Sequence, residues 1–485
     1  MRNLLIGNGV NIQHGGKRFG NQEIIVRTLR NFAEPTFPEH ILGDEPILAK
    51  CYMGYLFLEA RRILSGEDSE YALSQIERDS LREFGRRYGC RSSLRITDIG
   101  FEDYILLHDI FGHRIQTRIR EQSVTREAIK GWFLHAIYDD GRVNDIHRSF
   151  SDEFTEWMKT FDMLFTTNYD SNIELATKRE VLHLHGDFST RDSLYCPDSF
   201  QNQLPGRPHK QCVVDEKYPH LYSTALTTYS GEDKLRSMGV PLNANAGIEK
   251  SVAGYTKDES IRKAVDSWRS DPDPVLRSWG ESIVLRAENP NLKFTEDYPL
   301  APFKQITGEI AILGLSPYND HHLFRIMDKS AITRCTYYFH DESQREAVSS
   351  LLPNKQVVFE DVLSFWGGKH RSSSRTKSPQ RRQKTVCIKK PAFGELSDCY
   401  RALSESIMCD NDIVSQFNSV CEDTRAEICL DLSGLKQAKG IEAGQQFILS
   451  FIDLHIIATE YGLDPAVVCC IGVDRGRNEM IRLID

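Results

Sequence analysis

Six short apolar segments, each followed by a polar or glycine-containing turn, constrain the fold of this chain more than any other feature. Sequence patterns typical of helices lie between several of them. Strands that are buried on both faces of a parallel sheet read as continuous apolar runs, and helices connect them. The sequence therefore predicts an α/β fold built on a doubly wound, mostly parallel sheet. The predicted strands are residues 3–6, 163–167, 181–185, 309–315, 335–340 and 356–360.

The segments between and after these strands predict a chain of several parts. At 485 residues the chain is too long for one ordinary domain. Amphipathic stretches predict a large helical insertion after the first strand, and a segment rich in Pro, Gly, Asn and Asp predicts an irregular second insertion. After the last strand, a linker precedes a second, mainly helical domain for regulation or assembly. The predicted boundaries are 1–366 for the sheet domain, with insertions at about 20–150 and 189–302, 367–385 for the linker, and 386–485 for the C-terminal domain.

Composition narrows the classes of function. The content of 40% hydrophobic and 27% charged residues is typical of a soluble globular protein. No apolar run approaches the 18 residues of a membrane span, so no membrane contact is expected. The chain begins with a strand and leaves no room for a signal peptide, and its twelve scattered cysteines without a C-x-x-C pair favour reduced thiols. We therefore expect a cytoplasmic protein.

The charge distribution bears on the partners of the protein. A net charge of −9 gives no general attraction to nucleic acid. Residues 369–385 (KHRSSSRTKSPQRRQKT) are an exception, because they are basic, Ser-rich and hydrophilic. Such a segment is typical of a solvated linker, and it is also a candidate for contacts with phosphate or nucleic acid.

The first predicted strand runs into the loop GNGVN, in which Gly7 and Gly9 follow the strand directly. Glycine permits a tight turn and lets a pyrophosphate approach the backbone amides. The full dinucleotide fingerprint would require a third glycine at position 12, which is Ile12. The motif is therefore compatible with a nucleotide-binding loop and also with an ordinary turn after a strand.

Two later strands end in the polar motifs TTNYD and HG. Asp170 can be explained as a cap of the following helix, but Asn168 at the end of the strand has no such structural explanation. His185 is either a structural histidine with satisfied hydrogen bonds or a catalytic one. Ligands bind beyond the carboxyl ends of parallel strands, so we expect the turns at Gly7, Asn168, His185 and Ser316 to converge on one crevice.

The motif HLHGD also has the H-x-H-x-D spacing of metallohydrolases, because residues i and i+2 of a strand face the same way. His183, His185 and Asp187 are therefore alternative metal ligands for a metal-dependent hydrolase. The histidine expected after the aspartate is Phe188 in this chain, which leaves the motif incomplete. The adjacent pair His321–His322 is a poor candidate, because neighbouring residues rarely bind one metal ion.

The combination of motifs is more specific than any one of them. In chain order, strand–GxG, strand–TTNYD, strand–HG and strand–GLSPYND (314–320) resemble the sirtuin-like NAD-binding domains of bacterial anti-phage defence and abortive-infection proteins. TTNYD stands where sirtuins carry Gln-Asn-Ile-Asp, and HG stands where they carry the catalytic histidine. The resemblance covers roughly residues 1–366, and it implies a Rossmann-like, sirtuin-like fold.

This resemblance implies an NAD⁺ glycohydrolase, which cleaves NAD⁺ to nicotinamide and ADP-ribose as an effector of bacterial abortive-infection defence. NAD is then the substrate, and no metal is expected. The implied partners are further copies of the chain, or a sensor or partner protein of the same defence system. An alternative is a module that binds NAD or ADP-ribose without catalysis. The implied catalytic residues are Asn168, Asp170 and His185, and the implied NAD contacts are Gly7, Asn8, Gly9, Asn11, Thr167, Gly314, Ser316 and Asp320.

The chain departs from the sirtuin pattern in three ways. Asn8 and Asn11 replace an alanine and a serine of the first loop. The Asp-Phe-Arg motif after that loop is absent, and the nearest cations are Lys17 and Arg18. The four zinc cysteines of the protein deacetylases are also missing, which favours NAD hydrolysis over removal of acyl groups from lysine.

Overall fold

The computed structural model describes the sheet domain and most of its two insertions. The predicted linker and nearly all of the predicted C-terminal domain lie outside the described residues, apart from a strand pair, β7 (Ile471–Gly472) and β8 (Arg482–Leu483). The described residues are 1–32, 46–67, 69–89, 94–114, 122–190, 195, 213–239, 243–290, 292, 296–367, 471–472 and 482–483.

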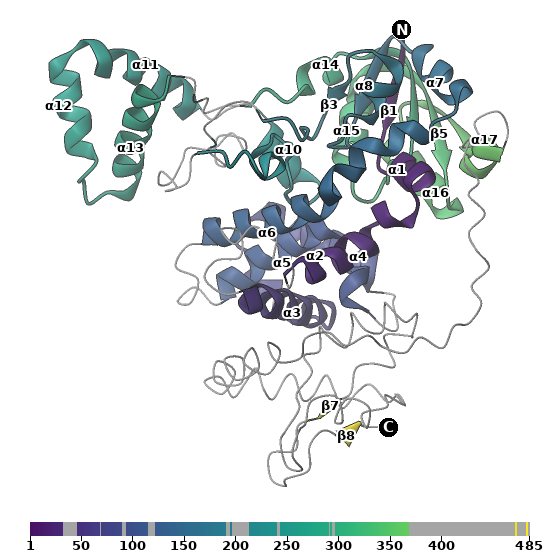
Figure 1. Cartoon of the computed structure of the whole chain (residues 1–485), viewed down its shortest axis with the longest axis horizontal. Coiled ribbons are helices and arrows are strands. Elements are labelled where there is room, and N and C mark those ends of the chain that lie inside the picture. The colour runs from purple at the N-terminus through teal and green to yellow at the C-terminus, as the bar shows by residue number, and fades with distance from the viewer. Residues whose placement is uncertain are drawn as a thin grey trace.

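The core of the protein is a six-stranded sheet in which every strand is parallel to its neighbours (Figure 1). The order β3-β2-β1-β4-β5-β6 is that of a Rossmann-like fold, so the predicted doubly wound α/β sheet is confirmed. All six predicted strands are present, although the third is shorter than expected. The strands are β1 (Arg2–Ile6), β2 (Met163–Thr166), β3 (Leu182–His183), β4 (Thr307–Leu313), β5 (Ala331–Phe339) and β6 (Gln356–Asp361).

Successive residues of each central strand point to opposite faces of the sheet, and both faces are buried. In β1, Leu4 and Ile6 join one apolar cluster, whereas Leu5 joins another. Helices cover both faces, which explains why the strands are apolar throughout. One face is covered by α1 (Gly9–Gly15), α7 (Asp152–Lys159), α8 (Asn172–Thr177) and α17 (Val362–Gly367). The other is covered by α10 (Glu232–Met238), α14 (Leu300–Lys304), α15 (His321–Lys329) and α16 (Glu342–Leu351).

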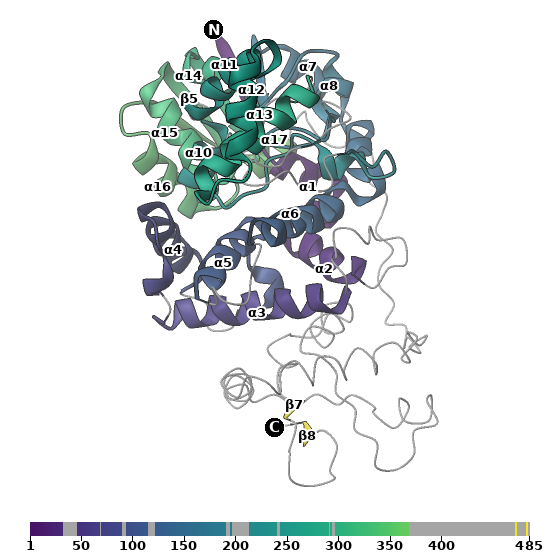
Figure 2. The same cartoon turned by 90° about the vertical axis from the view of Figure 1, so that its left-hand side faces the viewer.

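The first insertion is helical, as predicted, and packs around its own apolar core. In Figures 1 and 2 it lies below the sheet, at the edge where β1 ends. A capping box fixes the start of one of its helices: the Ser74 hydroxyl accepts a hydrogen bond from the Glu77 amide, and the Glu77 carboxylate accepts one from the Ser74 amide. The helices are α2 (Asn21–Asn31), α3 (Pro46–Leu64), α4 (Gln75–Tyr88), α5 (Phe101–Arg114) and α6 (Gln122–Tyr138).

The second insertion contains more helix than its sequence indicated. Besides α10, it holds α11 (Asn243–Lys257), α12 (Glu259–Trp268) and α13 (Pro274–Glu288), which share a small apolar core and project away from the sheet (Figure 1). Two of the aspartates that suggested irregular structure stand at helix starts. The side chains of Asp258 and Asp273 accept hydrogen bonds from the first amides of α12 and α13. No helix in the described part of the chain is long and apolar enough to span a membrane.

Two loops at the carboxyl edge of the sheet pack backbone against backbone, and glycine is required at the contact. The Gly7 amide donates to the carbonyl of Leu313, and the Gly9 amide donates to that of Gly314. A Cβ atom on Gly9 would lie 2.6 Å from the Gly314 Cα, and one on Gly7 would lie 2.5 Å from the Gly314 carbonyl oxygen. Gly314 itself has a φ of +74°, which glycine adopts without strain.

We expect Gly9→Ala to destabilise the protein by about 1–3 kcal/mol, because its Cβ would force the two loops apart. Gly85→Ala is a matched control. Gly85 lies inside α4, and a Cβ there would have no neighbour within 4 Å, so this change should be neutral or stabilising. Denaturant unfolding of both variants checks the prediction. Equal stability of the two variants would contradict the close-contact argument.

Candidate active site

A cavity of about 1180 Å³ lies at the carboxyl edge of the sheet, as the turns after the strands predicted. Its walls include ten of the eleven site residues that the resemblance to sirtuins implied, and Gly7 is the exception. The ten are Asn8, Gly9, Asn11, Thr167, Asn168, Asp170, His185, Gly314, Ser316 and Asp320. The predicted convergence of Asn168, His185 and Ser316 on one crevice is therefore found.

The glycines of the first loop do not act as predicted in this structure. The amides of Gly7 and Gly9 already donate to carbonyls of the β4–α15 connection, so neither is available to a pyrophosphate. Nearby, the Asn8 side chain donates to the carbonyl of Phe19. Arg18 forms an ion pair with Asp139 and does not line the cavity. The loop therefore shapes the cavity by its close packing.

The opposite wall of the cavity comes from the helical insertion, which motif analysis missed. Helix α4 contributes Glu83, Arg86 and Arg87, and α5 contributes Glu102 and Asp103. Arg87 pairs with Asp103 at 2.5 Å. No signal in the sequence marked these residues, because only the fold brings α4 and α5 opposite the sheet.

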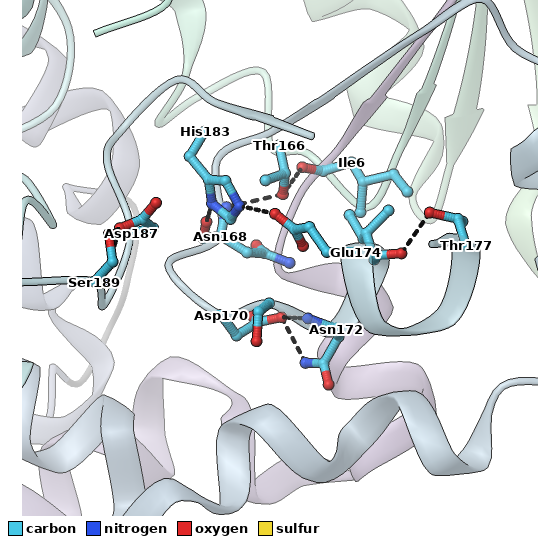
Figure 3. A network of polar contacts seen from close by, with 12 residues as sticks. Ile6, Thr166, Asn168, Asp170, Asn172, Glu174, Thr177, His183, Asp187 and Ser189 are labelled. Atoms are coloured by element: carbon cyan, nitrogen blue, oxygen red, sulfur yellow. Dashed lines mark hydrogen bonds and ion pairs between the residues drawn. The ribbon is translucent and has the colours of Figure 1, made fainter. Parts of the chain in front are cut away.

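Asp170 fixes the turn that follows β2 (Figure 3). One oxygen of its buried carboxylate accepts a hydrogen bond of 2.6 Å from the Asn11 side chain in α1. The other accepts from both the amide and the side chain of Asn172, at 3.1 and 2.5 Å. Burial raises the pKa of Asp170, and the hydrogen bonds from Asn11 and Asn172 oppose that rise. Asp170 thus supports the start of α8, as its capping interpretation expected, and it also ties α1 to the turn.

Asn168 presents its side chain to the cavity. Its backbone is held on both sides: the amide donates to the Thr166 hydroxyl at 3.1 Å, and its carbonyl accepts from Nδ1 of His183 at 2.8 Å. Its side-chain amide makes no hydrogen bond to any residue that the structure describes, although Asn168 is only 7% exposed. In Figure 3 this amide lies between the His183–Glu174 pair and Asp170. A buried amide of this kind is available to a ligand.

His183 supports the same turn and does not face the cavity. Its Nε2 atom pairs with the Glu174 carboxylate. Burial lowers the pKa of His183, but the hydrogen bond and the charge of Glu174 outweigh that effect, so the pKa lies above its usual value. Asp187 bonds to Ser189 and Thr224. The structure therefore does not bring His183, His185 and Asp187 together as metal ligands.

His185 lies two residues after the end of β3 and is almost completely buried. Its Nε2 atom is 3.3 Å from Nε2 of His322, and the two rings stack with centroids 5.4 Å apart. Burial lowers the pKa of His185 well below its usual value, and the charge of Lys234 adds to the effect. The ring is therefore neutral at pH 7, and it is a weaker base than the unperturbed histidine that the sequence suggested.

Asp320, one of the NAD contacts that the resemblance implies, lies beside His185. Burial raises the pKa of Asp320 to about 7, with a further contribution from Glu102, and Lys234 opposes the rise. Lys234 is fully buried and pairs with Glu102. Ser316 forms a local turn, in which its hydroxyl accepts from the Tyr318 amide at 3.3 Å. These groups give the cavity a buried, charged end around His185.

Comparisons with known proteins do not identify the function of this site. No protein-family model matches the chain, and comparisons with curated proteins and with solved structures find no match. A functional assignment therefore depends on the geometry of the cavity and on the motifs that line it.

The His183–Glu174 pair gives a testable pH dependence. A histidine whose pKa is raised on folding contributes stability that is full below its unfolded pKa of about 6.5 and is lost as the pH rises through the folded pKa. We expect Glu174→Gln to cost about 1 kcal/mol at pH 6 and less at pH 9.

Denaturant unfolding of wild type and variant at both pH values measures this difference. Glu156→Gln is the control, because Glu156 pairs with Lys159 on the surface, where ion pairs contribute little. A stability difference for Glu174→Gln that stays constant or grows with pH would contradict the assigned charge of His183.

Proposed function

We propose that this protein is an NAD⁺ glycohydrolase, which cleaves NAD⁺ to nicotinamide and ADP-ribose. The main observation behind the proposal is that Asn168 and His185 line the same cavity. The Asn168 side-chain amide has no hydrogen bond within the described part of the chain, and the buried His185 lies on the same wall. Both follow strands of a sheet whose order is that of dinucleotide-binding folds.

The cavity suits a ligand of dinucleotide size. Its volume of about 1180 Å³ exceeds the ~300–1,000 Å³ that small-molecule sites typically occupy. Arg86, Arg87 and Arg325 line it; each pairs with one carboxylate in this structure, and their remaining N–H groups would complement a diphosphate. These arginines come from α4 and α15, so they supply the cations that the glycine loop lacks.

The chemistry requires little acid catalysis. Water and NAD⁺ give nicotinamide, ADP-ribose and one proton; the bond that breaks joins the ribose to a nicotinamide that leaves as a neutral ring. The transition state is a ribose cation, which fixed dipoles stabilise. The Asn168 amide would orient the ribose or the attacking water. His185 would accept a hydrogen bond from that water or from a ribose hydroxyl, and Asp170 would hold the Asn168 turn in place.

The cellular role in the proposal comes from the motifs alone. Their resemblance to sirtuin-like domains of bacterial defence proteins supports an effector that depletes NAD⁺ in the cytoplasm during phage infection. Self-association, or a sensor protein of the same system, would then control it through residues 386–485. An enzyme that consumes NAD⁺ harms its own cell when it is active without a signal, so such control is needed.

One observation favours a second candidate, a module that binds NAD or ADP-ribose without cleaving it. The lowered pKa of His185 makes it a poor proton acceptor at pH 7. In this alternative the protein would bind the nucleotide as a signal and leave it intact. The two functions differ in the fate of the bound nucleotide.

Incubation with NAD⁺ followed by chromatography for nicotinamide and ADP-ribose tests the proposal. We expect His185→Gln to lower turnover by about 10²–10⁴-fold, the usual contribution of a positioned proton-transfer group. Asn168→Ala should lower it by about 10²–10³-fold, because it removes the amide that orients the ribose or the attacking water. Asn319→Ala is the matched control, because Asn319 also lines the cavity, and it should stay near the wild-type rate.

Melting temperatures of all three variants separate loss of activity from loss of fold. Wild-type turnover in well-folded Asn168 and His185 variants would overturn the assignment. Nucleotide that binds and is recovered intact, with and without candidate activators, would favour the binding module instead.

A further inference from the structure

Three potential metal ligands meet at the charged end of the cavity. His185 follows β3, Asp320 precedes α15, and His322 lies in the first turn of α15. One ligand atom from each of these residues lies within 4.8 Å of the other two. The two histidines are buried, and Asp320 is partly exposed. This set differs from the H-x-H-x-D motif, because only His185 belongs to both.

The distance between the two imidazoles fits a shared metal ion. Their Nε2 atoms are 3.3 Å apart. Two imidazole ligands of a tetrahedral zinc ion, each about 2.0–2.1 Å from the metal, have nitrogens roughly 3.3–3.4 Å apart. A direct hydrogen bond between the rings would lie beyond the usual ~2.7–3.2 Å range. The separation is therefore compatible with an ion shared by the two rings, and equally with a long hydrogen bond from one ring to the other.

Asp320 can complete the site. Its carboxylate has no hydrogen bond or ion pair with the residues that the structure describes, so a small rotation can bring it to a metal without breaking a contact. Its backbone is fixed, because its amide donates to the Ser316 carbonyl and its own carbonyl accepts from Leu323. Asp320 and His185 both line the cavity, which gives an ion a path to the site and leaves a coordination position open to the cavity.

The charges nearby permit a divalent ion. Lys234 carries a positive charge close to the histidines, and this charge opposes a cation. Lys234 is paired with Glu102, however, and Asp320 adds a second carboxylate to the same region. Once Asp320 has lost its proton, two carboxylates and one ammonium leave a net negative charge to offset the ion. Two neutral imidazoles and one carboxylate are a ligand set that zinc accepts in open sites.

We propose that His185, Asp320 and His322 form a binding site for a divalent transition-metal ion of the zinc class. In this site Nε2 of His185 coordinates the bound ion. A further consequence, which rests on the proposed function, is that the metal-bound protein cannot use His185 in NAD⁺ cleavage and is inhibited.

Zinc binding to the full chain, after treatment with a chelator, tests the site directly. Equilibrium dialysis against Zn²⁺ compares wild type with Asp320→Asn, His322→Asn and the control His321→Asn. His321 is next to His322, but its ring is turned by 86° and its Nδ1 contacts the Tyr318 carbonyl. We expect wild type and His321→Asn to bind one more zinc ion per chain than Asp320→Asn and His322→Asn. In these last two variants the affinity of the site for zinc should fall at least about tenfold. Any zinc bound elsewhere on the chain is common to all four proteins, so the difference isolates the site.

A second measurement guards against misfolding, because His322 is fully buried. Zn²⁺ should raise the melting temperature of wild type and of His321→Asn, and should not raise that of Asp320→Asn, whose side chain is partly exposed. Equal zinc binding by all four proteins would overturn the site. An equal loss in His321→Asn would also overturn it. Binding is measured without NAD⁺, so this result is independent of whether the protein cleaves NAD⁺.

Discussion

The contact between the β1–α1 loop and the β4–α15 loop fixes the elements that line the sheet side of the cavity. Gly7 and Gly9 let the first loop approach the backbone of Gly314 so closely that two amides donate directly across the gap. This contact places α1 beside the turn after β2, where Asn11 reaches Asp170. It also fixes the start of α15, which carries Asp320 and His322. The glycine motif, which suggested phosphate binding, therefore has a structural function in this protein. It allows two loops to pack backbone against backbone.

The groups around the cavity fall into two sets that differ in how many hydrogen-bond partners they have within the protein. Around the β2 turn, Asp170 and His183 are fully engaged with protein partners, and they hold the Asn168 backbone. At the other end, His185 is buried and Asp320 is partly buried, both have few partners, and burial favours the neutral form of each group. The first set provides rigidity, while the second set provides side chains that a ligand, a proton or a metal ion can address. Perturbed groups of the second kind are typical of functional sites.

Most of the sheet was predictable, because strands buried on both faces give continuous apolar runs and parallel strands bring their carboxyl ends together. That rule sufficed to gather Asn168, His185 and Ser316 on one crevice. The wall from α4 and α5 was not predictable, since no local pattern specifies which helix of an insertion faces the sheet. The partners of the Gly7 and Gly9 amides were missed for a similar reason, because a loop motif does not reveal the loop packed against it. His322 was discounted as one of an adjacent pair, yet successive residues at the start of a helix point in different directions, and only one of the two meets His185.

The proposed NAD⁺ cleavage and the proposed metal site both use the imidazole ring of His185. Neutral imidazole has a single unprotonated ring nitrogen, so Nε2 of His185 cannot bind a metal ion and accept a proton from water at the same time. If His185 instead uses Nδ1 toward the nucleotide, its Nε2 must carry the proton, and that tautomer excludes the metal as well. A metal ion and catalysis by His185 are therefore mutually exclusive in either tautomer. His322 then has a defined part in both states, because its Nε2 either shares the ion or accepts a hydrogen bond from His185, and in the second case it selects the tautomer that keeps Nδ1 of His185 unprotonated.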